Sequence, residues 1–570
     1  MSVTEKLINT FKKAVNVIRC SGYYRIITEK EVNDNWIYLE SRKCTDFASN
    51  IFHVAKELSK DEYKNFKVFV GYKKEKYDLI KSKLQESGLD EAVLVRHESK
   101  EYYECLALCK YFFTDFHLSH RYIKRKEQKI VSLWHGTPLK TLGKDCLTET
   151  QASVQRIFLL ADYHVYPGTF MKEKMIDVYW LKNLYKGEIL NTGYPRNSAF
   201  FNEDKRDEIR KELAIGGKRV IMYMPTFRGI AGVNRNKEQN EMLMGFFREI
   251  DDLLTDNDVF FIKLHNYNDA YIDCSEFKHI MKAPDRFDNY ELQNACDILV
   301  TDYSSVLFDF AVSGRKIILF QYDLEEYLKE RGVCIDMNEL PFPRVETPED
   351  LVMEINRPKN YSDKEFLKKY ANFDNENAPK LLCEKVLFDK NPDGFTVERL
   401  VANDKKNVII YCGALETEKE YDEFWGMINE LDLDKANYYI SYFEPIMYSH
   451  AERLACLPQK ANLLGMWGRI SFTFREYVAY FSATRFGITS KKGKQKLCNH
   501  FKREMIKHYG HDVKADTYVL WYTKDKDVVG LYLNAEGKKI ATSKLNGFEY
   551  VEKNNLSQYL NGEMQYIKES

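Results

Sequence analysis

Short apolar runs of strand length recur along this chain, and segments with helical periodicity separate them. Between residues 36 and 193 the runs include NWIYLE, KVFVGY, EAVLVR, KYFFTD and KIVSLWH. Such alternation is typical of parallel βαβ units, in which each crossover helix covers a face of a doubly wound sheet. A second series starts at Arg219 with RVIMYMP, DVFFIKLH, DILVTD and KIILF. The pattern therefore predicts an α/β fold with two such sheets in the first two thirds of the chain.

A third series begins near Asn407 with NVIIYCGAL and NYYISYF, and we expect ADTYVLWY, VVGLYLN and KIATSK to be further strands. KNPDGFT (390–396) reads as the linker to this separate α/β domain. The predicted division is an N-terminal amphipathic helix (1–30), two Rossmann-like domains (31–200 and 201–390) and an accessory α/β domain (400–570). Because residues 407–570 lack the motifs described below, we expect their removal to leave the chemistry largely intact.

Composition narrows the classes of partner. The chain has 85 Lys+Arg against 86 Asp+Glu, a balance that argues against nucleic-acid binding. Its 12 cysteines show no metal-ligand spacing and read as reduced thiols. No signal peptide and no apolar stretch of about 18 residues is visible, so we expect a cytoplasmic protein, free or peripheral on the inner face of the cell membrane.

Two basic segments leave their roles open. Residues 4–19 place apolar side chains on one helical face among lysines, which fits either an anionic membrane interface or packing on the chain's own domain. The lysine-rich run 491–507 is more typical of a solvated helix face than of a binding patch.

The stretch Val131–Gly143, VSLWHGTPLKTLG, holds the first candidate site residue. His135 stands where a predicted strand ends, and Gly136 beside it lets a ligand approach the backbone. In open α/β sheets, ligands bind outside the carboxyl ends of the strands. A second histidine, His265, ends the predicted strand DVFFIKLH in the other half. A histidine found alone at such a place is more often an ordinary capping residue of a strand-to-loop turn.

Two further elements suit phosphate. Ser304 and Ser305 open a predicted helix after DILVTD, where backbone N–H groups and hydroxyls can bind an anion. Helix capping is the alternative, but it explains one such serine better than two. Arg196 follows a short strand in GYPRN and is either a bidentate phosphate ligand or a solvated loop residue.

Taken together, the motifs resemble one family, and they keep its order over residues 30–345: WIYLESRKCTDF (36–47), WHGTPLKTLG (134–143), GYPRN (193–197), MPTFR (224–228), IKLH (262–265) and TDYSSVLFDF (301–310). They are similar to the CDP-glycerol glycerophosphotransferases, which comprise teichoic-acid primases and polymerases and related capsule polymerases. The resemblance implies a GT-B fold, in which two Rossmann-like domains face each other across a cleft. Residues 413–443 resemble the first half of a further GT-B-like unit that lacks its glycine-rich loop.

The resemblance also implies roles for individual residues. His135 would be the catalytic base and His265 the second catalytic histidine, on opposite walls of the cleft. The implied donor-binding residues are Gly136, Thr137, Pro138, Arg196, Pro225, Thr226, Arg228, Lys263, Ser304, Ser305 and Asp309. Two positions depart from the family pattern: Lys263 stands where an arginine is usual, and Ile317 where a proline is common. Lysine keeps the charge but loses the fork geometry of arginine.

The implied reaction moves glycerol phosphate, or a similar polyol phosphate, from CDP-glycerol or CDP-ribitol to a hydroxyl of a lipid-linked or polymeric acceptor, with release of CMP. No DxD-type cluster is present, so we expect no tightly bound metal, although bulk Mg²⁺ could assist. The alternatives are a GT-B glycosyltransferase that uses a nucleotide-sugar and a non-catalytic polymer-binding scaffold. The sequence leaves open glycerol or ribitol, primase or polymerase, and wall polymer or capsule.

Overall fold

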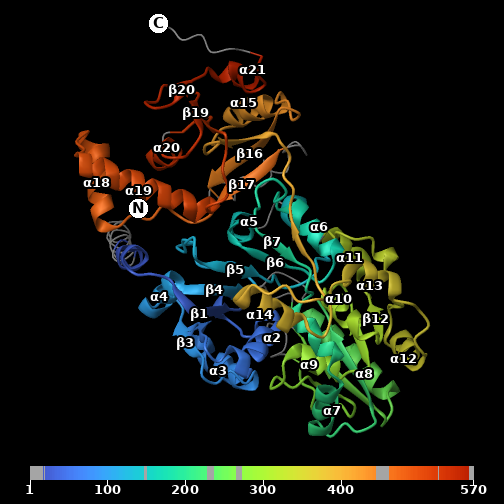
Figure 1. The fold of residues 1–570 in the computed structure, drawn as a ribbon. Helices are drawn as coiled ribbons and strands as arrows, with labels where there is room; N and C mark the ends of the chain where they lie inside the picture. Colours follow the sequence, from blue (N-terminus) through green and yellow to red (C-terminus); the bar gives the residue numbers. More distant parts are fainter. Residues whose placement is uncertain are drawn as a thin grey trace.

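Three separate sheets form the framework of the protein (Figure 1). The computed structural model describes Val17 and residues 20–146, 151–226, 236–264, 272–330, 332–443, 461–523 and 525–563. We call the parts built around the three sheets the first half, the second half and the third unit. Pairing within each sheet is parallel apart from one edge strand, so the α/β class predicted from the alternating pattern is confirmed.

The first sheet has eight strands in the order β14-β7-β6-β5-β4-β1-β2-β3, and only β14, at the edge, runs antiparallel. Its strands are β1 (Asn33–Glu40), β2 (Lys67–Tyr72), β3 (Val93–Arg96), β4 (Cys109–Thr114), β5 (Lys129–Ser132), β6 (Tyr163–Val165), β7 (Glu188–Leu190) and β14 (Val397–Arg399). The accompanying helices are α2 (Ser49–Leu58), α3 (Tyr77–Glu86), α4 (Lys100–Leu108), α5 (Gln151–Leu160) and α6 (Thr169–Val178), with short 3₁₀ turns η1 (Arg42–Cys44) and η5 (Pro195–Phe201).

The second sheet has the order β10-β9-β8-β11-β12-β13. Its strands are β8 (Arg219–Met224), β9 (Asp258–Ile262), β10 (Ile280–Lys282), β11 (Ile298–Thr301), β12 (Lys316–Phe320) and β13 (Arg344–Val345). Its helices are α7 (Glu203–Glu212), α8 (Asn236–Leu253), α9 (Asn289–Asn294), α10 (Val306–Phe310), α11 (Leu324–Glu330) and α12 (Pro348–Asn356). Numbered from β8, the order is 3-2-1-4-5-6, that of a dinucleotide-binding sheet, and its switch point lies between β8 and β11.

The third sheet, β17-β16-β15-β18-β19-β20, repeats this order. Its strands are β15 (Lys406–Tyr411), β16 (Ala436–Phe443), β17 (Asn462–Met466), β18 (Thr517–Leu520), β19 (Lys538–Ala541) and β20 (Glu549–Tyr550). Its helices are α15 (Glu418–Asn429), α18 (Phe474–Phe486), α19 (Lys491–Tyr509), α20 (Lys526–Leu533) and α21 (Leu556–Leu560).

One strand prediction was wrong: VVGLYLN lies in α20. Val528, Leu531 and Tyr532 are buried at helical spacing on one face. A short apolar run of this kind does not by itself distinguish a buried strand from a buried helix.

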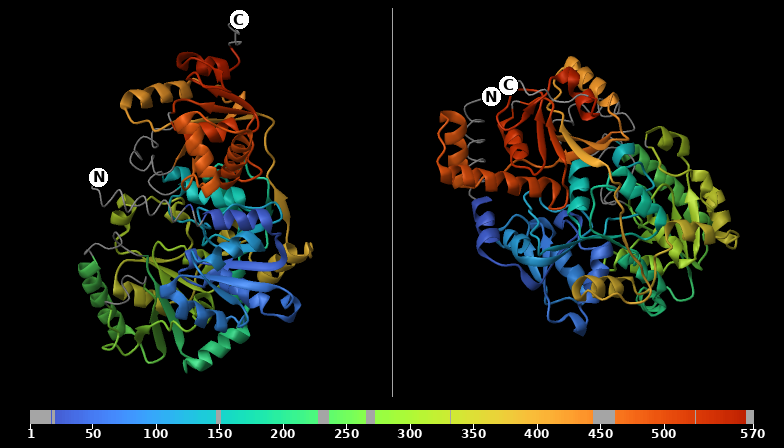
Figure 2. Two further views of the ribbon diagram at one scale, coloured as in Figure 1. Left: turned by 90° about the vertical axis from the view of Figure 1, so that its left-hand side faces the viewer. Right: turned by 45° about the horizontal axis from the view of Figure 1, so that its top comes forward.

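The third unit lies against the first half (Figure 2). Leu464, Met466 and Phe501 belong to the same apolar core as the first sheet. The side chain of Gln155, on α5, bonds the edge of β17, donating to the oxygen of Leu463 at 2.7 Å and accepting from the N–H of Gly465 at 3.1 Å. The predicted linker 390–396 runs directly into β14, a strand of the first sheet. This packing argues against the expectation that the third unit can be removed without consequence.

The chain leaves the second half and returns to the first through α13 (Lys364–Tyr370) and α14 (Ala378–Phe388). Helix α14 packs against α2. Before it, the carboxylate of Asp374 accepts the backbone N–H of Tyr194 at 2.8 Å. The turn GYPRN is therefore held from both halves.

Most of the predicted N-terminal amphipathic segment, residues 1–16, 18 and 19, lies outside the described residues. Residues 20–29 are helical, and the rings of Tyr23 and Tyr24 are buried in the core of the first half. Among the described residues we find no helix with the length and apolar character needed to cross a membrane.

Candidate active site

His135 follows β5 on a sharply turned piece of backbone. Trp134 has a φ of 49° and Gly136 a φ of 150°, both in the region that favours glycine. These two residues flank His135 and turn the backbone sharply on either side of it. Trp134 is buried as a result, whereas the ring of His135 is exposed.

Aromatic rings and one hydrogen bond fix the orientation of His135. Its ring stacks on Trp134 with centroids 4.0 Å apart, and on Phe116 with centroids 5.6 Å apart. Nδ1 lies 3.3 Å from the backbone oxygen of Asp115, which can only accept, so the proton belongs on Nδ1 and Nε2 is left as an acceptor, with no hydrogen bond to it from the described residues.

The surrounding protein keeps this imidazole neutral at pH 7. Desolvation is the main cause, and the positive charges of Arg42 and Arg196 add to it; together they lower the pKa of His135 to about 4. A ring that is accessible to solvent and is still desolvated by its neighbours is typical of the floor of a cleft.

The carboxylate of Asp115 organises the loop after β1. It accepts the hydroxyl of Ser41 at 2.8 Å and the backbone N–H of Arg42 at 2.7 Å. The side chains of Arg42 and Lys43 are exposed, and Nζ of Lys43 lies 4.4 Å from the centroid of Phe116, the ring that stacks on His135. Our sequence reasoning missed these two cations. The available signal was their place directly after a strand's carboxyl end.

Arg196, in η5, forms a buried ion pair with Asp309 of α10. Nε lies 3.1 Å from Oδ1, and Nη2 lies 2.8 Å from each carboxylate oxygen. Nη1 donates to the hydroxyl of Ser49 and to the backbone oxygen of His135, both at 3.0 Å. Burial alone would lower the pKa of Arg196, but Asp309, together with Tyr290 and Tyr194, raises that pKa, so the guanidinium stays charged. The N–H groups that the prediction assigned to phosphate are therefore engaged within the protein, and Arg196 joins the two halves.

The two serines stand directly across from Gly136. Ser304 and Ser305 precede α10, and both are half-buried. A Cβ atom added to Gly136 would lie 3.2 Å from the hydroxyl of Ser305, so the His-Gly turn of one half touches the helix start of the other. Ser305 occupies the N-cap position without making a side-chain capping bond. Ser304 accepts only a long bond, 3.5 Å, from the N–H of Val306. Capping therefore leaves Ser305 unexplained.

Comparison with known proteins agrees with this arrangement. The family CDP-Glycerol:Poly(glycerophosphate) glycerophosphotransferase matches residues 22–387. The chain belongs to this family. The resemblance drawn from its motifs is confirmed, and with it the assignment as a transferase of the glycerophosphotransferase type.

Individual relatives cover different shares of the chain. The teichoic acid poly(glycerol phosphate) polymerase of Bacillus spizizenii is 27% identical over 388 residues, which are 64% of this chain and 95% of the relative. The teichoic acid glycerol-phosphate primase of Bacillus subtilis (strain 168) is 29% identical over 248 residues, 42% of this chain and 62% of the relative. A solved structure of the wall teichoic acid polymerase TagF has a TM-score of 0.55 at 23% identity and covers 68% of this chain and 98% of TagF, which supports the shared GT-B-like fold.

Other predicted donor-site residues of the glycerophosphotransferase motifs lie at the junction of the halves. The hydroxyl of Thr137 points to the sulfur of Met171 at 3.8 Å, and the backbone oxygen of Pro138 accepts the thiol of Cys334 at 2.9 Å. The side chain of Thr137 thus faces the interior of the first half. The diphosphate-lining role predicted for Gly136, Thr137 and Pro138 stays a prediction.

The second sheet contributes its switch point. Pro225 and Thr226 follow β8, and the N–H of Thr226 donates to Asp302 at 2.8 Å, which joins the ends of β8 and β11. Lys263, after β9, pairs with Asp285 at 2.6 Å. Arg228 and His265 lie outside the described residues. The predicted placement of His135 and His265 on opposite walls therefore stays a prediction.

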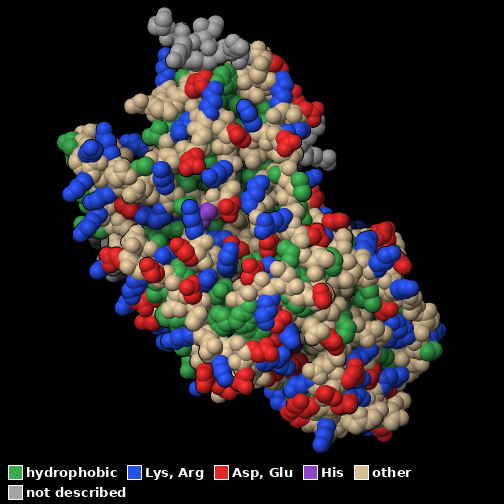
Figure 3. All heavy atoms as spheres, in the orientation of Figure 1, with side chains coloured by type: hydrophobic (Ala, Val, Ile, Leu, Met, Phe, Trp, Pro, Cys, Tyr) green, Lys and Arg blue, Asp and Glu red, His purple; other side chains and the backbone are tan. Residues whose placement is uncertain are grey.

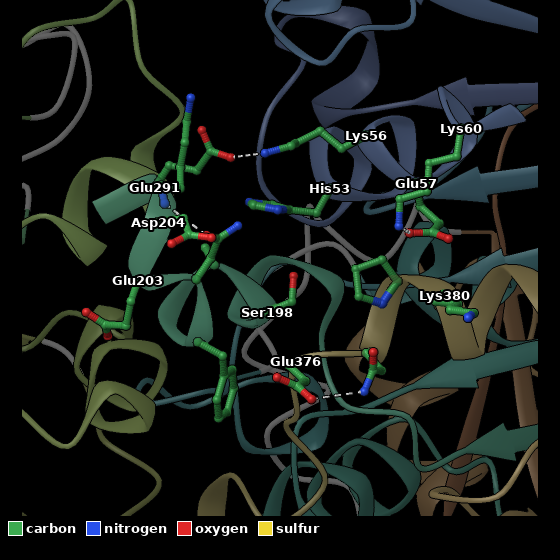
Figure 4. Close-up of a pocket in the computed structure, with 16 residues that line it drawn as sticks. His53, Lys56, Glu57, Lys60, Ser198, Glu203, Asp204, Glu291, Glu376 and Lys380 are labelled. Carbon is green, nitrogen blue, oxygen red and sulfur yellow. Dashed lines mark hydrogen bonds and ion pairs between the residues drawn. The ribbon is translucent and has the colours of Figure 1, made fainter. Parts of the chain in front are cut away.

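A pocket of about 570 Å³ opens elsewhere between the halves, beside α2 (Figure 4). Charged side chains that line it pair with one another, as Lys56 does with Glu291 and Lys60 with Glu57. None of the predicted site residues lines it. We therefore assign this pocket to the contact between the halves and not to the donor site. Among the described residues, no group of three or more His, Cys, Asp or Glu side chains is placed to hold a metal ion.

Proposed function

We propose that this chain transfers glycerol phosphate from CDP-glycerol to a hydroxyl of a lipid-linked or polymeric acceptor, as a peripheral protein on the inner face of the cell membrane. The observation that carries the proposal is the meeting of His135-Gly136 with Ser305 across the two halves. It brings the turn that carries the neutral imidazole of His135 close to the hydroxyl of Ser305, which makes no capping bond. In the glycerophosphotransferase family, such a place suits attack on a nucleoside diphosphate ester.

The proposed reaction is a single displacement. The acceptor oxygen attacks the β-phosphorus of CDP-glycerol, the bond from that phosphorus to the oxygen of CMP breaks, and CMP leaves. The hydroxyl proton passes to Nε2 of His135. Ser304, Ser305, Lys263 and His265 would balance charge on the phosphate oxygens.

The low pKa of His135 is compatible with this role. A base with a pKa of about 4 is weak at pH 7, and general bases work best near the operating pH. The donor brings two phosphate charges next to the ring, and nearby negative charge raises the pKa of a histidine. The bound donor would therefore strengthen the base that it needs.

The exposed cations Arg42 and Lys43 follow β1 of the first sheet, and Lys43 lies over the Phe116 ring that stacks on His135. In our proposal they attract the terminal phosphate of the acceptor. This assigns the acceptor to the first half and the donor to the second, in line with the two predicted Rossmann-like domains.

The test is a donor panel with a matched pair of histidine variants. Wild type is incubated with CDP-glycerol, CDP-ribitol and a UDP-sugar, and release of CMP or UDP is measured. We expect CMP release, and His135→Ala to lower its turnover by roughly 10²–10⁴-fold while donor binding persists. His97→Ala, which changes a half-buried histidine beyond β3, is the control. UDP release would favour the glycosyltransferase alternative, no release from any donor would favour the scaffold, and an active His135→Ala enzyme would place the base elsewhere.

A further inference from the structure

The helical hairpin α18–α19 of the third unit carries an exposed apolar stripe. Phe474, Phe486 and Ile488 have exposed fractions of 66%, 64% and 69%. With them, the exposed large apolar side chains of this stretch are Phe474, Tyr477, Val478, Phe481, Phe486 and Ile488. Phe474, Tyr477, Val478 and Phe481 have the spacing of one face of α18, whereas Phe486 ends the helix and Ile488 follows it. Elsewhere in the described chain, exposed large apolar residues are scattered.

The same hairpin presents positive charge without exposed negative charge. Within residues 467–507, all of them described, the only acidic side chains are Glu476 and Glu504, and both are buried. Glu476 pairs with Arg503 at 2.7 Å, and Glu504 pairs with Lys507. The exposed cations are Arg469, Arg475, Arg485, Lys491, Lys492, Lys494, Lys496 and Lys502. In a chain of net charge −1, this is a strong local asymmetry.

The hairpin projects from one side of the third unit, at the upper left of Figure 1. Green and blue side chains lie together on that projection in Figure 3. The helix of residues 20–29 starts beside it, because the N–H of Phe474 donates to the hydroxyl of Ser21 at 3.0 Å.

We propose that the α18–α19 hairpin docks on an anionic lipid surface. The apolar stripe would enter the boundary between headgroups and acyl chains, and the lysines and arginines would meet the lipid phosphates. The lysine-rich run 491–507, taken alone, indicated only a solvated helix face. The apolar stripe on the neighbouring helix α18 changes this interpretation. The hairpin lies beyond the residues that match the glycerophosphotransferase family. The inference rests on the proposed function, because a lipid-linked acceptor would be held at such a surface.

A soluble polyanion, such as a polyol-phosphate chain, would satisfy the same cations. It would, however, leave the aromatic and aliphatic stripe in water, and burial of that stripe is what a lipid surface adds. The observations therefore favour the lipid surface, and the polyanion becomes an outcome of the test.

The test is flotation of the full-length protein with vesicles of phosphatidylcholine alone or mixed with phosphatidylglycerol. We expect binding to the anionic vesicles and its loss at high salt. Phe481→Ser/Phe486→Ser should weaken it by about ten-fold or more through lost apolar burial. Lys492→Glu/Lys496→Glu should weaken it at least as much, since each cation near the surface contributes roughly a factor of five. Leu328→Ser/Met353→Ser, which changes exposed apolar residues of the second half, is the matched control and should bind like wild type.

Two results would overturn the proposal. One is vesicle binding that both hairpin variants retain in full. The other is binding that depends on the lysines but not on the phenylalanines and is reproduced by soluble polyphosphate, which would assign a polyanion site. CMP release with a soluble acceptor is also measured on every variant. It shows whether the fold and the proposed function persist, independently of vesicle binding. A loss of vesicle binding with normal CMP release concerns the hairpin alone, and vesicle binding by a wild type that releases no CMP counts only against the proposed function.

Discussion

The ion pair between Arg196 and Asp309 gives a sharp test of how the two halves are held. Both side chains are buried, and the guanidinium makes three contacts of 2.8–3.1 Å with the carboxylate. Removing one member of such a pair usually costs about 3–5 kcal/mol, because the other is left as an uncompensated buried charge. We expect Asp309→Leu and Arg196→Met to reduce the free energy of unfolding by different amounts, because the charge that each variant leaves behind behaves differently.

The two remaining charges can escape to different degrees. In Asp309→Leu, Arg196 stays buried and cannot lose its proton at any accessible pH. In Arg196→Met, Asp309 can become neutral by taking up a proton, since burial without a partner raises the pKa of a carboxyl group. We therefore expect Asp309→Leu to be the more destabilising change, at about 4–5 kcal/mol independent of pH.

The cost of Arg196→Met should instead depend on pH. In this variant the folded-state pKa of Asp309 lies above its unfolded value of about 3.9. The folded state then binds more protons at Asp309 than the unfolded state does, so the cost of the substitution is smallest at low pH and grows as pH rises through the folded-state pKa. The double variant Arg196→Met/Asp309→Leu should recover part of the loss, because it contains no unpaired charge.

Hydrogen exchange with mass spectrometry is the suitable assay, because a chain with three sheets need not unfold in two states. Peptides that cover residues 134–137 and 304–310 report the opening of the junction between pH 5 and 8. Peptides from the third sheet serve as the internal control. The reasoning would be refuted if the two single variants lost the same free energy of opening at every pH and if the loss in the double variant were their sum. Such a result would indicate that the pair is solvated.

Other outcomes follow from the same site. Because His135 must be neutral to accept a proton, kcat/KM should fall only as pH drops through about 4, and an acid limb near 6.5 would show that the cleft does not desolvate the ring. Ser304→Ala/Ser305→Ala should weaken donor binding by roughly two to four powers of ten and abolish thermal protection by CMP; equal protection of both proteins would make the serines structural. Gly136→Ala should lower turnover, because its Cβ would lie 3.2 Å from the Ser305 hydroxyl at a φ of 150°; an unimpaired enzyme would show that the turn can relax. A chain cut after residue 395 should melt lower or aggregate, since the first core loses its partners from β17 and α19; a fully stable fragment would contradict the shared core.

Much of the architecture was predictable because buried parallel strands read as short apolar runs. The strands that lead to the site, β5, β8, β9 and β11, follow this pattern. Strands of two or three residues, such as β10 and β13, were missed because they are too short to show an apolar pattern. Such strands are recognised by their hydrogen bonds to the neighbouring strand. The run VVGLYLN was misread for a related reason: its Val and Leu residues are buried on a helix face instead of in a strand.

The site was predictable one element at a time, but its assembly was not. His135, Gly136 and Ser305 were each identified as candidates, yet their contact depends on how two sheets are placed relative to each other. Arg196 and Asp309, 113 residues apart, were both assigned to the donor. No local pattern indicates that they neutralise each other, and only the packed junction shows it.

This pairing also limits how the cleft can move. Opening the halves at Arg196 would break and expose its buried ion pair with Asp309. Within the first half, the same guanidinium also binds the backbone oxygen of His135 at 3.0 Å. The cost of breaking such a pair makes a large separation at this point unfavourable. The His-Gly turn and the start of α10 are thus held together before any donor arrives. Since catalytic groups that are fixed in advance need no reorganisation during the reaction, we expect the pair to assist catalysis by positioning, because its two charges face each other.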